Sequence, residues 1–190
     1  MTIRTMCCLW SEVHFYGYVL FLNGYIVYIS IMYDIPMGPL DEAVIHDHAD
    51  AVRLLLEHGA RKIYDHYVLL SHLASMGNVD IMTMLCDYGL YEGYEDILSS
   101  VVYVAINCLY ANRYPAVELL LKCGADVDYK GLMYHTPLRI ACYKGDARMA
   151  RLLLDHGANP LSKSSSGITP LDIAIQGKHD DIVEMLHNAT

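Results

Sequence analysis

A 33-residue internal period constrains the fold of this chain more than any other feature. Thr136 in "HTPLRIACYKGD" and Thr169 in "ITPLDIAIQGKHD" stand 33 positions apart, and the same interval separates Gly124 from Gly157, which close two similar apolar stretches. A period of this length is typical of a solenoid, because each repeat is a small unit that can bury its apolar side only against its neighbours. The period therefore predicts a stack of similar units.

The period continues towards the N-terminus with more variation. Gly38-Pro39-Leu40 occupies the Thr-Pro-Leu place in the first unit, and Val68-Leu69-Leu70 occupies it in the second. The sequence therefore predicts five units after an N-terminal segment, residues 1–33, and their bounds are 34–63, 64–95, 96–130, 131–163 and 164–190.

The residue types within each unit predict two helices joined by a short turn. Thr136 and Thr169 suit the N-cap of a first helix, and the prolines that follow them suit its first turn, where a missing N–H costs nothing. The first helices share an alanine that permits close helix approach: Ala43, Ala105, Ala141 and Ala174. Apolar residues at helical spacing predict the second helices. Each of four second helices is followed by a glycine suited to a left-handed end: Gly59, Gly89, Gly124 and Gly157.

These features resemble the ankyrin repeat, whose T-P-L-H-x-A pattern matches residues 136–141 and 169–174, with "LLLDHGANP" and "LLLKCGADVD" as helix-end signatures. The resemblance implies an all-α fold, an α-solenoid of about five stacked ankyrin repeats with β-hairpin or turn loops between them. It also implies a non-catalytic protein-interaction module. Short, tyrosine-rich chains of this style are similar to ankyrin proteins of large DNA viruses and intracellular bacteria, which engage host proteins. Adaptor-type members add a C-terminal box that recruits a ubiquitin ligase, and we do not expect that box within residues 1–190.

In the ankyrin family, partners commonly dock on the concave face formed by the hairpin tips and the exposed side of the first helices. Tyrosine and methionine at exposed places are residue types that interfaces favour. We therefore expect Tyr67, Met133 and Tyr143 to anchor a protein partner, unless these side chains only pack against the neighbouring hairpin. Carried over position by position, the whole face consists of Tyr67, Met76, Asn107, Leu132, Met133, His135, Tyr143, Lys144, Ser165, Ser166, Ile168 and Gln176.

Composition narrows the partners and the compartment. The 22 acidic and 13 basic residues give a net charge of −9, and no basic cluster or glycine-rich phosphate loop offsets it, so we do not expect nucleic acid as a partner. The six cysteines form no C-x-x-C pair, and we do not expect the apolar run Val13–Tyr33 to be a cleaved signal peptide, so a reducing compartment is expected. We expect a monomer in the cytoplasm, with the nucleus as an alternative.

Histidines and cysteines give little support for chemistry. His58 and His156 precede the closing glycine of two units, whereas a cysteine or a tyrosine fills that place in two others, which argues against a required ligand. A histidine there can instead favour the negative end of the helix dipole. His46 and His48 have a spacing that is weak evidence for zinc. We therefore expect no metal, no cofactor and no enzymatic activity, and a metal-dependent activity using His and Cys residues is the alternative.

The N-terminal segment, residues 1–33, leaves two interpretations open. Val13–Tyr33 contains 21 residues without Asp, Glu, Lys or Arg, enough for a membrane-spanning helix that would tether the repeats. Tyrosines spread along it and Asn23-Gly24 in its middle weaken that interpretation. Alternatively, "YVLFLNGY" resembles the end of a second helix, and the segment is a degenerate repeat that caps the first unit.

Overall fold

The chain divides into two compact units, Met1–Met37 and Gly38–Thr190. The structure, a computed structural model, describes residues 16–22, 25–31, 38–63, 65–107, 113–131 and 135–189. In the second unit, the described residues form ten α-helices in five consecutive pairs. This confirms the predicted α-solenoid for the second unit.

The described part of the first unit is a β-hairpin. Strand β1 (Tyr16–Leu22) pairs antiparallel with β2 (Tyr25–Ile31), with Tyr16 opposite Ile31. The helix expected here, whether it crossed a membrane or ended a repeat, was therefore wrong. The residues explain the strands, because tyrosine, valine and isoleucine favour extended backbone. The dipeptide Asn23-Gly24 between two such runs is also a strong hairpin signal.

The N-terminal segment was expected either to cross a membrane or to cap the first repeat. Among the described residues, no helix has both the length and the apolar character needed to cross a bilayer. The capping role of residues 1–33 stays a prediction.

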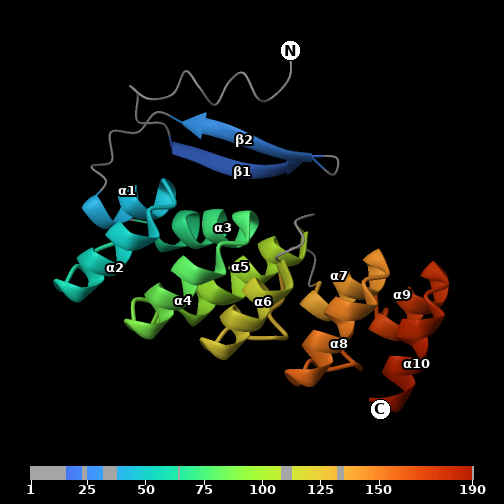
Figure 1. Ribbon diagram of the computed structural model, residues 1–190. Helices are drawn as coiled ribbons and strands as arrows, with labels where there is room; N and C mark the ends of the chain where they lie inside the picture. Colours follow the sequence, from blue (N-terminus) through green and yellow to red (C-terminus); the bar gives the residue numbers. More distant parts are fainter. Residues whose placement is uncertain are drawn as a thin grey trace. The chain divides into compact units, whose positions relative to one another are not determined.

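The helices of the second unit lie in two layers (Figure 1). The first layer contains the first helix of each pair: α1 (Pro39–Ile45), α3 (His66–Met76), α5 (Glu95–Asn107), α7 (Pro137–Lys144) and α9 (Pro170–Gly177). The second layer contains α2 (Ala49–Glu57), α4 (Val79–Asp87), α6 (Arg113–Lys122), α8 (Ala147–Asp155) and α10 (Asp180–Asn188). Each helix packs against the next helix of its own layer and against the other helix of its pair. Each repeat therefore shares its core with its neighbours, as a solenoid requires.

The Thr-Pro-Leu motif begins two first-layer helices in different ways. Thr169 is the N-cap of α9, and its hydroxyl accepts a hydrogen bond from the Asp172 N–H at 3.2 Å. The Asp172 carboxylate in turn accepts one from the Thr169 N–H at 2.8 Å, which completes a capping box. Thr136 is the N-cap residue of α7, but its hydroxyl makes no capping hydrogen bond and lies 3.4 Å from the Ser162 hydroxyl. The capping expected of the threonines therefore holds in full only for Thr169.

The second repeat departs most from the sequence pattern. Helix α3 begins at His66, ahead of Val68, which stands at the place of the capping threonine. Its N-cap is Asp65, whose carboxylate accepts a hydrogen bond from the Val68 N–H at 2.9 Å. Asp65 therefore adds about one turn to the start of this helix. At the other end of α3, Gly77 is left-handed, as Gly145 is at the end of α7.

The second-layer helices supply the repeated core. Five leucines near their ends are at most 1% exposed: Leu56, Leu85, Leu120, Leu153 and Leu186. Burying one such side chain stabilises the fold by about 1.5–3 kcal/mol. The glycines predicted to end four of these helices have the expected positive φ values of 87°, 70°, 102° and 86° at Gly59, Gly89, Gly124 and Gly157. The first-layer alanines are buried as well.

Polar contacts also join successive repeats. The Asp128 carboxylate accepts hydrogen bonds from the Asn159 N–H at 3.0 and 3.1 Å. The Asp146 carboxylate, at the start of α8, pairs with the Arg113 guanidinium at 2.5 Å and accepts a hydrogen bond from the Tyr114 hydroxyl at 3.1 Å. Both contacts join the third repeat to the fourth.

Candidate partner-binding face

Three large side chains of the predicted face extend from the first layer into solvent. Tyr67 and Met76, near the two ends of α3, are 42% and 59% exposed. Tyr143, near the end of α7, is 79% exposed, the highest value among the large apolar side chains that the structure describes. Met76 and Tyr143 each lie near the C-terminal end of their helix. Tyr67 lies near the N-terminal end of α3, about 13 Å from Met76 at 1.5 Å per residue.

Asn107 and Lys144 lie near Tyr143, and each side chain donates a hydrogen bond to a main-chain carbonyl. The Lys144 ammonium donates a hydrogen bond to the Ile106 carbonyl at 3.0 Å, which ties the end of α7 to the end of α5. The Asn107 side-chain amide donates to the Tyr103 carbonyl at 2.9 Å within α5. These hydrogen bonds therefore hold two polar side chains in place near the exposed Tyr143.

The turn before α9 presents Ser165 and Ser166. The Ser164 N–H donates to the Ile168 carbonyl at 3.1 Å, and the Gly167 N–H donates to the Ser164 carbonyl at 2.9 Å. The two serines therefore occupy the tip of a closed turn, and both are exposed. The Ile168 side chain, at the base of the turn, is 42% exposed.

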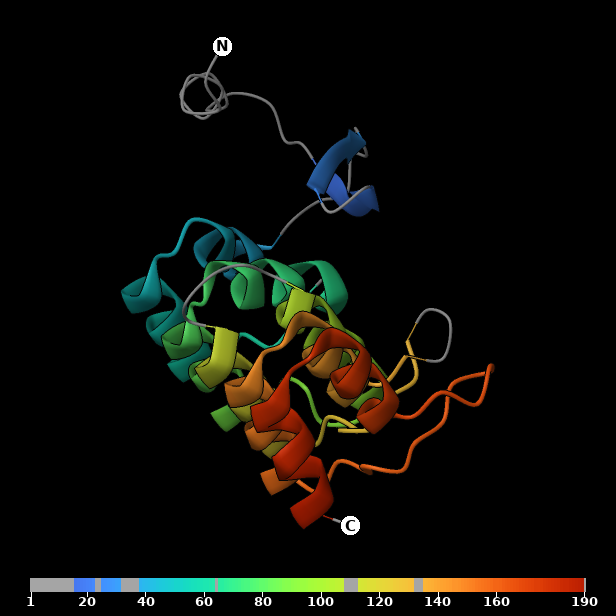
Figure 2. The same cartoon turned by 90° about the vertical axis from the view of Figure 1, so that its right-hand side faces the viewer.

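The turn before α7 repeats this link one period earlier, because the Gly131 N–H donates to the His135 carbonyl at 3.2 Å. Figure 2 shows that the described parts of the connections leading to α7 and α9 lie on the same side of the helices. Leu132 and Met133 lie outside the described residues, so their place on the face stays a prediction. Burial lowers the pKa of His135, and the Arg139 guanidinium lowers this pKa further. His135 therefore adds no positive charge at neutral pH.

Sequence reasoning did not identify two residues of this region, Arg139 and Ile175. Arg139 is 2% exposed, and its guanidinium donates to the Ile168 carbonyl, so it positions the turn before α9. Its place as the fourth residue of the T-P-L-H motif was the signal available in the sequence. Ile175 on α9 is 56% exposed, beside the predicted and exposed Gln176. Cys142 stands at the same place in the preceding repeat and is fully buried, so the two repeats differ at this place.

The histidines show contacts that belong to helix ends. Nδ1 of His58 and Nδ1 of His156 each contact the carbonyl oxygen four residues earlier, at 2.8 and 2.9 Å. His46 and His48 are exposed, and their ring centroids lie 6.2 Å apart. Across the part of the chain that the structure describes, no three His, Cys, Asp or Glu side chains are grouped so that they could hold a metal ion.

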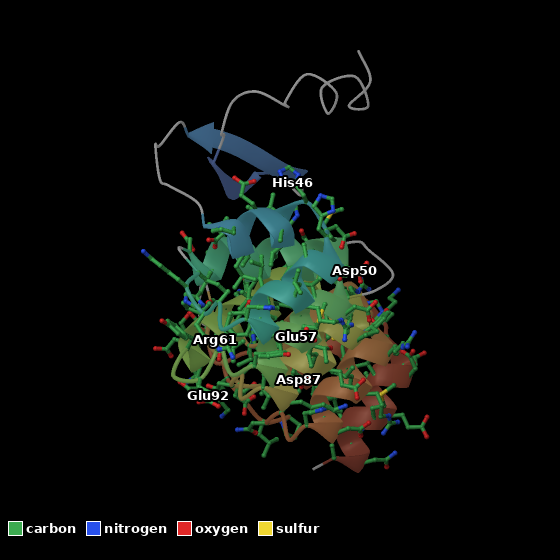
Figure 3. The ribbon with its side chains drawn as sticks, turned by 60° about the vertical axis from the view of Figure 1, so that its left-hand side comes forward. His46, Asp50, Glu57, Arg61, Asp87 and Glu92 are labelled. Carbon is green, nitrogen blue, oxygen red and sulfur yellow. The ribbon has the colours of Figure 1, made fainter. Side chains whose placement is uncertain are left out.

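Charged side chains occupy a different surface of the repeats. Figure 3 shows Asp50 and Glu57 on α2, Asp87 at the end of α4 and Glu92 in the loop that follows, all of them exposed. Carboxylates are strongly hydrated and are depleted from the centres of protein interfaces. The first layer, with its tyrosines and methionine, is therefore the better candidate for a contact surface.

Comparisons with known proteins match the repeats directly. The sequence model described as "Ankyrin repeats (3 copies)" matches residues 103–190, and the one described as "Ankyrin repeat" matches residues 37–65. Ankyrin repeat and SOCS box protein 11 of Danio rerio is 34% identical over 136 residues, 72% of this chain and 35% of the relative. Ankyrin repeat and SOCS box protein 16 of Mus musculus is 45% identical over 65 residues, 34% of this chain and 14% of the relative. Inversin of Gallus gallus is 35% identical over 79 residues, 42% of this chain and 7% of the relative.

The two-layered stack of helix pairs with turns on one side defines a helical repeat protein of the solenoid class. The chain belongs to the ankyrin-repeat family, as its sequence motifs indicated. Repeats of this family form protein-interaction modules, and this is the general role of the second unit. The chain spans 14% and 35% of the lengths of the two SOCS box relatives, so the similarity concerns their repeats.

Proposed function

We propose that this chain is a non-catalytic module that binds a protein partner through the first layer and the turns that precede α7 and α9. The observation that carries the proposal is the exposure of Tyr67, Met76 and Tyr143 on α3 and α7, two helices of one layer. The proposed face consists of Tyr67, Met76, Asn107, Leu132, Met133, His135, Tyr143, Lys144, Ser165, Ser166, Ile168 and Gln176.

The composition of this face supports a protein partner. Tyrosine and methionine supply large apolar contact areas, and residues of this kind dominate the binding energy at the centres of interfaces. Asn107, Lys144 and the two serines of the exposed turn supply hydrogen-bonding groups around them, as the polar rim of an interface does. Because main-chain hydrogen bonds close the turn, its tip loses little conformational freedom when a partner binds.

The thiols support a non-catalytic role in a reducing compartment. Burial raises the pKa of Cys142 to about 12, so this thiol stays protonated and is a poor nucleophile at neutral pH. The three described cysteines, Cys86, Cys123 and Cys142, are free thiols. We include in the proposal a cytoplasmic or nuclear location, a monomeric state and the absence of nucleic-acid binding, which the net charge of −9 supports.

Affinity capture with matched variants tests the proposal. The variant Y67A/M76A/Y143A removes the three exposed side chains of the first layer, and L54A removes an apolar side chain of the second layer that is 57% exposed. We expect the triple variant to lose at least tenfold of the captured partner, because hot-spot truncations cost about 2 kcal/mol or more each. L54A should retain capture, and both variants should keep the melting temperature of the parent chain. Equal capture by the triple variant and the parent would refute the proposed face.

A further inference from the structure

The last helix pair that the structure describes, α9 and α10, exposes apolar residues at places that the preceding pair buries (Figure 1). Helix α7 packs against α9, and α8 packs against α10. In α7 and α8, three apolar residues are fully buried: Leu138, Cys142 and Ala150. One period later, the same places hold Leu171, Ile175 and Val183. Ile175 is 56% exposed and the other two are half-buried, so this apolar surface remains partly open to solvent.

Asp172 changes the polarity of the same surface. Arg139, at the same place in the preceding repeat, is 2% exposed and donates a hydrogen bond to the Ile168 carbonyl of the next repeat. Asp172 is exposed, and its carboxylate accepts a hydrogen bond from the Thr169 N–H of its own repeat at 2.8 Å. A negatively charged acceptor therefore stands where the preceding repeat has a positively charged donor. It favours contact with a cationic side chain.

Lys178 stands where the preceding repeat has Gly145. A Cβ at Gly145 would lie 2.5 Å from Cε1 of His179, the residue that precedes α10, so a side chain at this place is directed at the following repeat. Lys178 is exposed and has the same left-handed backbone. Another repeat stacked in the same way would therefore meet the Lys178 side chain, and a single helix is the better occupant. Five residues form this open surface, the end face: Leu171, Asp172, Ile175, Lys178 and Val183.

The charges around the end face are mostly negative. Helix α10 carries the exposed residues Asp180, Asp181 and Glu184, and its sequence contains no lysine or arginine. Together with Asp172, these carboxylates outnumber the single ammonium of Lys178. A basic partner is therefore attracted to this surface. A second copy of this chain is disfavoured, because two copies joined at the end face would bring their acidic α10 helices together.

We propose that the end face binds a basic amphipathic helix of a protein partner. The apolar side of that helix covers Leu171, Ile175 and Val183, as the following repeat covers the same places in the preceding pair. Lysine or arginine residues along the flank of the helix meet the carboxylates of Asp172 and of α10. None of the residues of the end face belongs to the face proposed on the first layer, so this inference does not depend on that proposal.

Fluorescence anisotropy with two labelled peptides tests the proposal on the full chain. Both peptides have about 14 residues, which is roughly 21 Å as a helix, and both carry the same stripe of leucines. One peptide has lysines along its flank, and the other has glutamates at the same positions. We expect the lysine peptide to bind, with an affinity that falls as the salt concentration rises, and the glutamate peptide not to bind.

Two matched variants locate the binding surface. I175D and L54D introduce the same carboxylate at apolar side chains that are 56% and 57% exposed. We expect I175D to weaken binding of the lysine peptide about tenfold, although the added negative charge would itself attract that peptide. The neutral variant I175S should weaken binding as well. L54D and the first-layer variant Y67A/M76A/Y143A should bind like the parent chain, and all four variants should keep its melting temperature.

Several results would overturn the proposal. Binding of neither peptide, or equal binding of both, would show that the end face does not select a basic helix. An unchanged affinity in I175D and I175S, or an equal loss in L54D, would place the contact elsewhere. A dimer in analytical ultracentrifugation that I175D dissociates would show that a second copy of the chain occupies the end face.

Discussion

Replacing Gly145 by alanine probes the packing of the last two repeats. Gly145 ends α7 with a φ of 67°, a left-handed conformation that costs a residue with a side chain about 1–2 kcal/mol. A Cβ at this position would also lie 2.5 Å from Cε1 and 2.7 Å from Nδ1 of His179, the residue that begins α10. Overpacking of this kind costs about 1–3 kcal/mol. We therefore expect G145A to lower the free energy of unfolding by about 2–5 kcal/mol, the sum of the two costs.

Gly59 provides the matched control for this substitution. Its φ is 87°, but a Cβ there would meet no atom within 4 Å, so G59A should lose only about 1–2 kcal/mol. His179 makes no side-chain capping hydrogen bond, so H179A should be mild by itself. In the double variant H179A/G145A, the clash is absent, and the cost of the alanine should fall to that of G59A.

Urea denaturation followed by circular dichroism at 222 nm measures these differences. The account predicts G145A to be clearly less stable than G59A and predicts rescue by H179A. If G145A and G59A lose the same stability, or if H179A gives no rescue, the packing of the His179 ring against Gly145 is wrong.

Three further predictions concern a helix end, an ion pair and a pair of histidines. Lys178 ends α9 with a φ of 57°, so K178G should raise the free energy of unfolding by about 0.5–1 kcal/mol, and a loss of stability would contradict the left-handed assignment. The variant D146A leaves the Arg113 guanidinium half-buried without its carboxylate, and should cost about 2–4 kcal/mol in urea denaturation. The double variant D146A/R113M should cost less, and an equal loss would show that the pair is not the cause. Burial lowers the pKa of His66 and of His72, both in the second repeat, below the usual value of 6.5. The folded state therefore binds fewer protons than the unfolded state. The contribution of the two histidines to stability is present above pH 6.5 and is lost as the pH falls below 6.5. The double variant H66Q/H72Q should flatten this loss of stability, which denaturation midpoints at pH 7.5 and 5.5 will show.

The repeats could be predicted from the sequence because their signals are local and occur several times. Thr169-Pro170 at a helix start and Gly157 at a helix end are determined by backbone conformation, which a few neighbouring residues control. The helix pairs then follow, since a single pair cannot bury its apolar side.

Other features depended on competing local signals or on distant contacts. At the N-terminal segment, the apolar run suggested a helix, but β-branched and aromatic residues around Asn23-Gly24 favour a hairpin. The role of Arg139 depends on the Ile168 carbonyl, which lies in the next repeat, and no local pattern contains that contact. Ile175 is 56% exposed, although Cys142 at the same place one period earlier is buried, so the period alone does not determine exposure in the last repeat.

Site-specific photo-cross-linking shows whether the first layer contacts a protein partner. A benzophenone amino acid at position 143 replaces the most exposed apolar side chain of that layer, and the same group at position 54 reports on the second layer. The account predicts that the probe at 143 cross-links a discrete protein, whereas the probe at 54 does not. The same cross-linked protein from both positions, or a cross-link from position 54 alone, would contradict it.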